Sequence, residues 1–142
     1  MIFESGRALI IGVGSYANAV EMNVPITVAD AQAVNAVLTN SALCGYLSEQ
    51  VKVLHDGTAT KDSILQAIGN LAQAPSDHTV LLYYCGHGAD GTDGNYYLTT
   101  HESQFAGDKV VKGTGISDGE LLDALRQIKA QRLLLLFNAC HS

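Results

Sequence analysis

The sequence predicts an α/β fold, a mostly parallel sheet flanked by helices on both faces. Short apolar runs alternate along the chain with segments whose apolar residues recur at helical spacing, and this alternation is typical of parallel sheets. The runs are apolar at nearly every position, as in strands that are covered on both faces. With 142 residues, of which 47% are hydrophobic, the chain has the size and composition of one globular domain.

The first half of the chain predicts two strand–helix units. An apolar strand over residues 7–13 ends in glycines, and apolar residues at helical spacing begin at Ile26. A second strand over residues 51–54 stops at a turn, and Thr60 is a suitable N-cap for the helix that Pro75 ends.

The second half predicts two further long strands. Residues 79–85 are expected to form a buried strand, followed by a glycine-rich loop over 86–94, a short strand over 96–99 and an irregular loop over 101–116. Residues 132–137 are expected to form the last strand.

The end of the chain combines a helix signal with an unusual strand. Ser117 and Glu120 have the spacing of a capping box, which predicts that a helix begins there. The strand over residues 132–137 is apolar on both faces, so it should lie inside a sheet, yet only a few residues follow Phe137. We therefore expect the chain to be one part of a larger fold that a second segment completes.

Charge and cysteine content narrow the classes of function. Lys and Arg number 8 and Asp and Glu 14, which gives a net charge of −6. An acidic chain without a basic cluster argues against nucleic acid and membrane surfaces as partners, and no apolar run is long enough for a membrane helix or a signal peptide. The odd cysteine count, Cys44, Cys85 and Cys140, indicates reduced thiols and a cytoplasmic location.

The candidate chemistry lies where two predicted strands end. His87 follows the third strand and Cys140 the fourth, and the carboxyl ends of neighbouring parallel strands meet at one edge of a sheet. An imidazole beside a thiol lowers the pKa of the thiol and later protonates the leaving group. The backbone N–H groups of Gly88 and Cys140 would form the oxyanion hole.

Five short motifs resemble, in order, those of caspase-like cysteine peptidases, metacaspases and their prokaryotic relatives in particular. They are the strand with its His-Gly motif at 83–88, the Asn-Ala-Cys-His-Ser at 138–142, the first strand at 7–16, the helix opening at 29–31 and the strand after the histidine at 93–98. The resemblance implies the caspase–hemoglobinase fold. It implies that residues 1–142 are the large, p20-like portion of a catalytic domain whose small, p10-like portion is absent from this chain.

The resemblance also implies a cysteine endopeptidase that acts on polypeptides, with Cys140 as nucleophile and His87 as general base and acid. It implies proteolytic processing, and a small p10-like subunit or downstream segment as partner. The metacaspase pocket for a basic residue before the scissile bond (P1) uses two aspartates, at the positions of Asp30 and Asn138 here. Residues 23–25 hold no arginine of the kind with which caspases bind aspartate, so we expect Arg or Lys at P1.

No cofactor is expected. The loops after His87 lack the dense acidic cluster through which calcium activates many metacaspases, so we favour solvated turn residues over a calcium site. The acidic residues concerned are Asp90, Asp93, Glu102 and Asp108. A zinc site would need Cys85, His87, Cys140 and His141 together, whereas Cys85 is better explained as a small buried residue.

Two other classes of function are alternatives. Residues 12–17 fit the dinucleotide pattern G-x-G-x-x-A after a strand, but Pro25 and two asparagines interrupt the helix that should begin there. The chain would otherwise be a catalytically silent, caspase-like scaffold that recruits partners. The presence of both His87 and Cys140 argues against the scaffold, and the reactivity of Cys140 with a thiol reagent discriminates the two.

Overall fold

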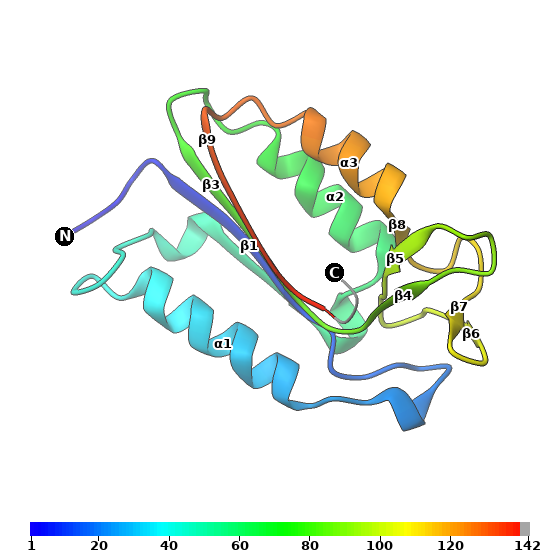
Figure 1. The fold of residues 1–142 in the computed structure, drawn as a ribbon. Coiled ribbons are helices and arrows are strands. Elements are labelled where there is room, and N and C mark those ends of the chain that lie inside the picture. Colours follow the sequence, from blue (N-terminus) through cyan, green and yellow to red (C-terminus); the bar gives the residue numbers. More distant parts are fainter. Residues whose placement is uncertain (140–142) are drawn as a thin grey trace.

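The computed structural model describes residues 1–139. Its centre is a four-stranded sheet in the order β2–β1–β3–β9, in which all three pairings are parallel (Figure 1). The strands are β1 (Gly6–Gly12), β2 (Val51–His55), β3 (Thr79–Cys85) and β9 (Arg132–Asn138). All four strands therefore end at the same edge of the sheet.

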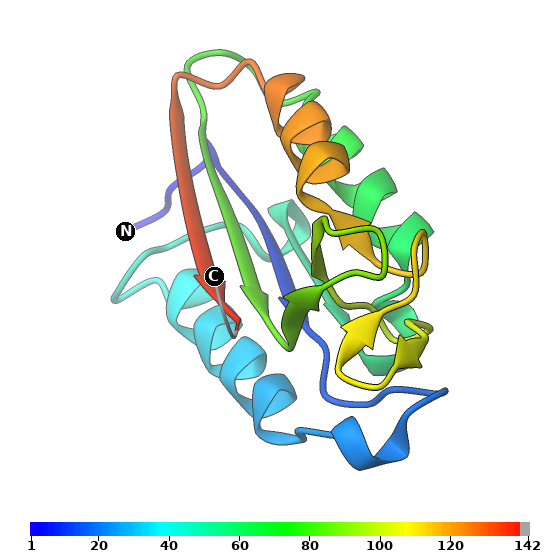
Figure 2. The ribbon, with the colours of Figure 1, turned by 45° about the vertical axis from the view of Figure 1, so that its right-hand side comes forward.

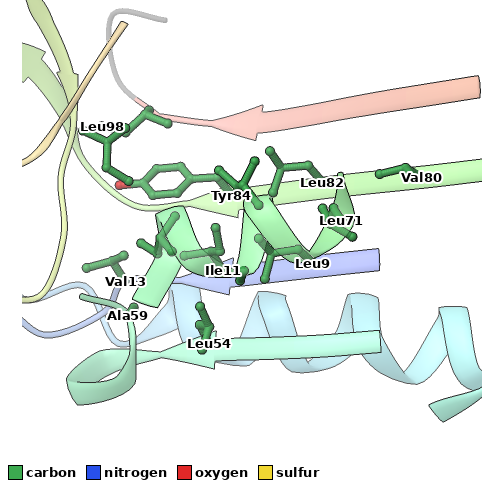
Figure 3. Close-up of a cluster of buried hydrophobic side chains, with 14 of the residues drawn as sticks. Leu9, Ile11, Val13, Leu54, Ala59, Leu71, Val80, Leu82, Tyr84 and Leu98 are labelled. Carbon is green, nitrogen blue, oxygen red and sulfur yellow. The ribbon is translucent and has the colours of Figure 1, made fainter. Parts of the chain in front are cut away.

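Helices cover both faces of this sheet, as the alternation of patterns predicted (Figure 2). On one face lies α1 (Ile26–Thr39), and on the other lie α2 (Lys61–Leu71) and α3 (Asp118–Arg126). Successive strand residues point to opposite faces, so β1, β2 and β3 each supply both cores. The core under α2 and α3 (Figure 3) includes Leu9, Ile11, Leu82 and Tyr84, and the core under α1 includes Ala8, Ile10 and Leu81.

Both predicted helix starts are confirmed. Thr60 accepts a hydrogen bond from Ser63 N at 3.2 Å. Ser117 Oγ accepts from Glu120 N at 3.2 Å, while Glu120 Oε2 accepts from Ser117 N at 3.0 Å. These side chains satisfy amides that have no partner within their helix, so the sequence determines where α2 and α3 begin. Within the described part of the chain, no helix is long and apolar enough to cross a bilayer.

The two loops expected after β3 contain short strands, so the prediction of a loop throughout 86–94 was wrong. β4 (Gly88–Asp90) and β8 (Ile116–Ser117) flank β5 (Tyr96–Leu98), and β6 (Phe105–Ala106) pairs with β7 (Lys109–Val110). Strands of two or three residues are too short to leave a periodic pattern. Single turns of 3₁₀ helix, named η1 to η3, lie at Val20–Met22, Ser48–Gln50 and Asp56–Thr58.

The position of β9 bears on the expectation that a second segment completes the fold. This strand, which is apolar on both faces, lies at the edge of the sheet that residues 1–139 form. The four leucines at 133–136 leave between 37% and 49% of their surface exposed. Among residues 1–139 no strand pairs with the free side of β9. An unpaired apolar edge exposes both backbone hydrogen-bonding groups and hydrocarbon to water, and proteins usually cover such edges.

Candidate active site

His87 lies just beyond the carboxyl end of β3, beside the end of β9. The register pairs Cys85 with Asn138, and Gly86 N donates a hydrogen bond to Asn138 O at 3.2 Å. The adjacency of the two strands, which the sequence analysis assumed, is therefore present. Cys140 lies outside the described residues, so the structure brings the two segments together only as far as the end of β9.

The loop that follows β1 holds the imidazole of His87. Nε2 lies 2.7 Å from the backbone oxygen of Met22, and the ring packs against Tyr16 with centroids 5.3 Å apart. A carbonyl oxygen only accepts, so Nε2 carries the hydrogen, and in neutral imidazole the lone pair is then on Nδ1. The sequence analysis missed Met22 because every residue has a backbone carbonyl, which leaves no sequence signal.

Three buried hydroxyl groups contact the backbone of His87. His87 N donates to Tyr16 Oη at 3.0 Å, and Thr99 Oγ1 donates to His87 O at 2.7 Å. Tyr84 Oη lies 3.0 Å from His87 O but has a single hydrogen, which bonds the nearer Thr99 O at 2.8 Å. All three side chains are at most 1% exposed. The sequence analysis did not single them out, because a buried tyrosine is usually a core residue.

The N–H of Gly88 points away from β5. Thr99 N donates to His87 O at 3.1 Å, and the next pair in the register is Gly88 with Leu98. In an antiparallel ladder, the residue next to a hydrogen-bonded pair directs its N–H away from the partner strand. This amide, buried beside His87, is therefore not bonded to β5.

The thiol of Cys85 has both expected P1-binding residues as neighbours. Burial raises the pKa of this thiol; a hydrogen bond with the Tyr83 side chain lowers it, the Asp30 carboxylate raises it, and a hydrogen bond with the Asn138 side chain lowers it. Cys85 is 4% exposed, which agrees with the predicted packing role, and a raised pKa makes it a poor nucleophile at neutral pH. Asn138 is the register partner of Cys85, and the carboxylate of Asp30 on α1 is near enough to act electrostatically on the same thiol.

A pocket of about 490 Å³ opens beside His87 and Gly88. Its walls come from η1, β4 and the turn between β6 and β7, and they carry three carboxylates and one ammonium group. The charged residues are Glu21, Asp90, Asp108 and Lys109. This excess of negative charge favours a basic ligand. Another pocket, of about 400 Å³, lies between β2 and α2 and contains none of the expected site residues.

The residues considered for a metal ion do not gather in one place. Within 1–139, no three His, Cys, Asp or Glu side chains are grouped to hold a metal ion. Asp93 accepts a hydrogen bond from Tyr97 Oη at 2.8 Å, and Glu102 accepts one from the first amide of α2 at 2.7 Å. Cys140 and His141, which the zinc alternative requires, lie outside the described residues.

The dinucleotide pattern lacks the helix that it requires. A pyrophosphate site presents the free amides of a helix N-terminus directly after the glycines. Here the chain passes through η1 before α1 starts at Ile26, and Gly14 N already donates to Asp56 Oδ1 at 3.1 Å. The turn after β1 is therefore not built for a dinucleotide.

The order and geometry of these elements agree with comparison to known proteins. The model of the caspase domain family matches residues 5–142. The chain belongs to this family. The match confirms the caspase-like α/β fold.

A solved structure has the same fold as this caspase domain. The crystal structure of protein GSU0716 from Geobacter sulfurreducens matches with a TM-score of 0.69 and 23% sequence identity. The match covers 96% of this chain and 51% of that one, so the caspase domain spans about half of that neighbour's length. A comparison with curated proteins finds no match.

Replacement of Asp30 by Asn is expected to lower the pKa of the Cys85 thiol. The carboxylate disfavours the thiolate by charge repulsion, and the amide removes this repulsion with little change of shape. The pKa is read from the pH dependence of the Cβ chemical shift of Cys85, with Cys44 in the same spectrum as reference. A Cys85 pKa that stays constant or rises would contradict the placement of Asp30.

Proposed function

We propose that this caspase domain is a cysteine endopeptidase that hydrolyses peptide bonds with Cys140 as nucleophile and His87 as general base and acid. The observation that carries the proposal is the parallel pairing of β3 with β9, in which Cys85 pairs with Asn138. His87 and Cys140 each follow that pair by two residues in the sequence, and the two strands that precede them end at one edge of the sheet. The hydrogen bond from His87 Nε2 to Met22 O adds support, because it leaves the lone pair of the neutral ring on Nδ1, the nitrogen that would take the thiol proton.

The proposed reaction proceeds in two halves. His87 Nδ1 takes the thiol proton, and the thiolate of Cys140 attacks the carbonyl carbon of the scissile bond. The N–H groups of Gly88 and Cys140 donate to the oxygen as it becomes negative. The imidazolium then protonates the leaving amine, the C–N bond breaks, and water hydrolyses the thioester with His87 as base. The contact with Met22 O holds the ring through these proton transfers.

Replacement of Cys140 by Ala or of His87 by Ala should each lower peptide hydrolysis by about 10³-fold or more, because each removes a group that takes part in bond making. The protein is expressed with its downstream segment, and both turnover of peptides and cleavage between the two portions are measured. Cys44→Ala, which removes a thiol far from β9, is the matched control.

Equal activity of the parent and Cys140→Ala would exclude Cys140 from the mechanism. A parent that hydrolyses nothing, and whose Cys140 reacts with a thiol reagent no faster than Cys44 and Cys85, would instead identify the silent scaffold. Cleavage between the portions by the parent, but not by Cys140→Ala, would support proteolytic processing by the domain itself.

The proposed specificity is for Arg or Lys at P1. Asp30 offers a carboxylate, and Asn138 can accept a hydrogen bond through its side-chain oxygen. Both are neighbours of the Cys85 thiol, and the pocket beside His87 also carries an excess of carboxylates. A single carboxylate at Asp30 binds a guanidinium less strongly than the two aspartates expected from the resemblance.

Asp30→Asn should lower kcat/KM for an Arg-ended peptide by about tenfold or more, since hydrogen bonds to charged groups contribute roughly 1.5–3 kcal/mol. Matched peptides that end in Arg, Lys and Asp are compared in the parent and in Asp30→Asn. Asp123→Asn, a carboxylate on α3 that pairs with Arg126, is the control for loss of charge. A preference of the parent for Asp would refute the proposed specificity.

The proposed partner is the small, p10-like portion, as a subunit or as the downstream segment, and it covers β9. The four half-exposed leucines of β9 and its unpaired edge are the surface that a further strand would bury. At about 25 cal/mol per Å² of apolar surface removed from water, covering them would stabilise the complete domain.

Backbone amides of β9 should exchange with solvent more slowly when the downstream segment is present than in residues 1–142 alone, because a neighbouring strand would accept their hydrogen bonds. Hydrogen exchange of both forms is followed by mass spectrometry. The other edge strand, β2, is the internal reference and should be unchanged. Equal exchange of β9 in the two forms would contradict the proposed partner surface.

A further inference from the structure

A ring of three hydrogen bonds begins and ends on the backbone of His87. His87 N lies 3.0 Å from Tyr16 Oη, Tyr16 Oη lies 2.8 Å from Thr99 Oγ1, and Thr99 Oγ1 lies 2.7 Å from His87 O. The amide can only donate and the carbonyl can only accept. Since each hydroxyl has one hydrogen, Tyr16 donates to Thr99 and Thr99 donates to His87 O. The geometry therefore determines the direction of every bond in the ring.

This ring replaces one bond of the ladder between β4 and β5. Thr99 N donates to His87 O at 3.1 Å, and in an antiparallel pair a return bond from His87 N to Thr99 O is expected. Instead, His87 N donates to Tyr16, and Thr99 O accepts from Tyr84 Oη at 2.8 Å. Two tyrosine hydroxyls thus connect His87 and Thr99 to the loop after β1 and to β3.

The ring is buried and electrically neutral. Tyr16 is 1% exposed and Thr99 is fully buried. Burial raises the pKa of Tyr16, with hydrogen bonds to Thr99, His87 and Tyr84 acting in the opposite direction, so the phenol keeps its hydrogen at neutral pH. In such surroundings a hydrogen bond is strong, and a donor or acceptor without a partner is costly. Loss of one hydroxyl would therefore affect the whole ring.

The same loop also contacts the imidazole itself. The Tyr16 ring packs against the His87 ring with planes tilted by 43°, Tyr16 N donates to Asn23 Oδ1 at 2.8 Å, and Met22 O bonds Nε2 of His87. His87 is thus held at its amide, its carbonyl and its side chain by contacts that converge on Tyr16 and the residues near it. Without these contacts, neither the backbone nor the ring of His87 would be fixed in position.

We propose that Tyr16 and Thr99 are positioning residues, whose hydroxyl groups hold His87 where its Nδ1 can exchange a proton with the nucleophile; this rests on the peptidase function proposed above. Both side chains are buried and so are not accessible to a substrate. Displacement of a catalytic group by about 1 Å can cost 10²-fold in rate, so the ring acts on the chemical step and leaves substrate binding unaltered.

Tyr16→Phe and Thr99→Val remove one hydroxyl each and keep the size of the side chain. In the protein with its downstream segment, each should lower kcat by about tenfold or more and leave KM within about twofold. Because both open the same ring, the double variant should lose no more than about the larger single loss. Thr99→Ser, which keeps the hydroxyl, should restore most of kcat.

Tyr97→Phe is the matched control. Tyr97 is also buried, at 3% exposed, and its hydroxyl donates to Asp93 at 2.8 Å without contact to His87, so kcat should stay at the parental value. An unchanged kcat in Tyr16→Phe would overturn the proposal. So would losses that multiply in the double variant, since the two hydroxyls would then act separately.

Amide exchange of His87 tests the ring without any assay of activity. The His87 amide, read by NMR, should exchange faster in Tyr16→Phe than in the parent and be unchanged in Tyr97→Phe.

If the parent hydrolyses no peptide yet His87 behaves in this way, the peptidase function fails while the ring stands as a structural device. If the parent is active and exchange and kcat are both unaffected, the positioning role fails alone. Should Tyr16→Phe not fold, Thr99→Val and Thr99→Ser carry the same comparison.

Discussion

The candidate site depends on the parallel register of β1, β3 and β9. Gly12 pairs with Cys85, and Cys85 pairs with Asn138, so these three strands end side by side at one edge of the sheet. The loop after β1 brings Tyr16 and Met22 to this edge, and the turn after β3 brings His87. An antiparallel strand in any of these positions would send its loop to the far edge. The direction of the strands therefore determines where the site forms, and the side chains determine its chemistry.

Close approach of backbone and side chains makes this edge compact. A Cβ on Gly86 would lie 2.6 Å from Tyr84 Oη and 3.2 Å from the Cβ of Val13, so a larger residue would displace the turn that leads to His87. Gly12 lies equally close to α1, where a Cβ would meet Thr27 O at 2.8 Å. Because Gly12 and Gly86 have no side chain, the loop after β1, helix α1 and the end of β3 can pack closely together. The hydroxyl groups of Tyr16 and Thr99 can then reach the backbone of His87.

The parts of the fold that could be predicted are those with local causes. The capping box at Ser117 and the N-cap at Thr60 act within one turn of helix, and the central strands are long enough to leave apolar runs. β4 could not be predicted, because its three residues pair only when β5 is already in place. The apolar run of β9 indicated that this strand can be buried on both faces, but only the fold shows that no other strand among residues 1–139 covers its free edge.

The sequence by itself determined the class of fold, the order of strands and helices, and the placement of His87 and Cys140 after two apolar strands, because these follow from periodicity and from residue identity. Only the tertiary structure decided what surrounds His87. The carbonyl of Met22 and the hydroxyls of Tyr16 and Thr99 reach His87 through contacts between residues that are distant in the chain. The pairing of β4 with β5 determines in which direction the Gly88 amide points. Backbone groups carry no sequence signal and a buried tyrosine resembles any other core residue, so these contacts exist only once the strands have set their register.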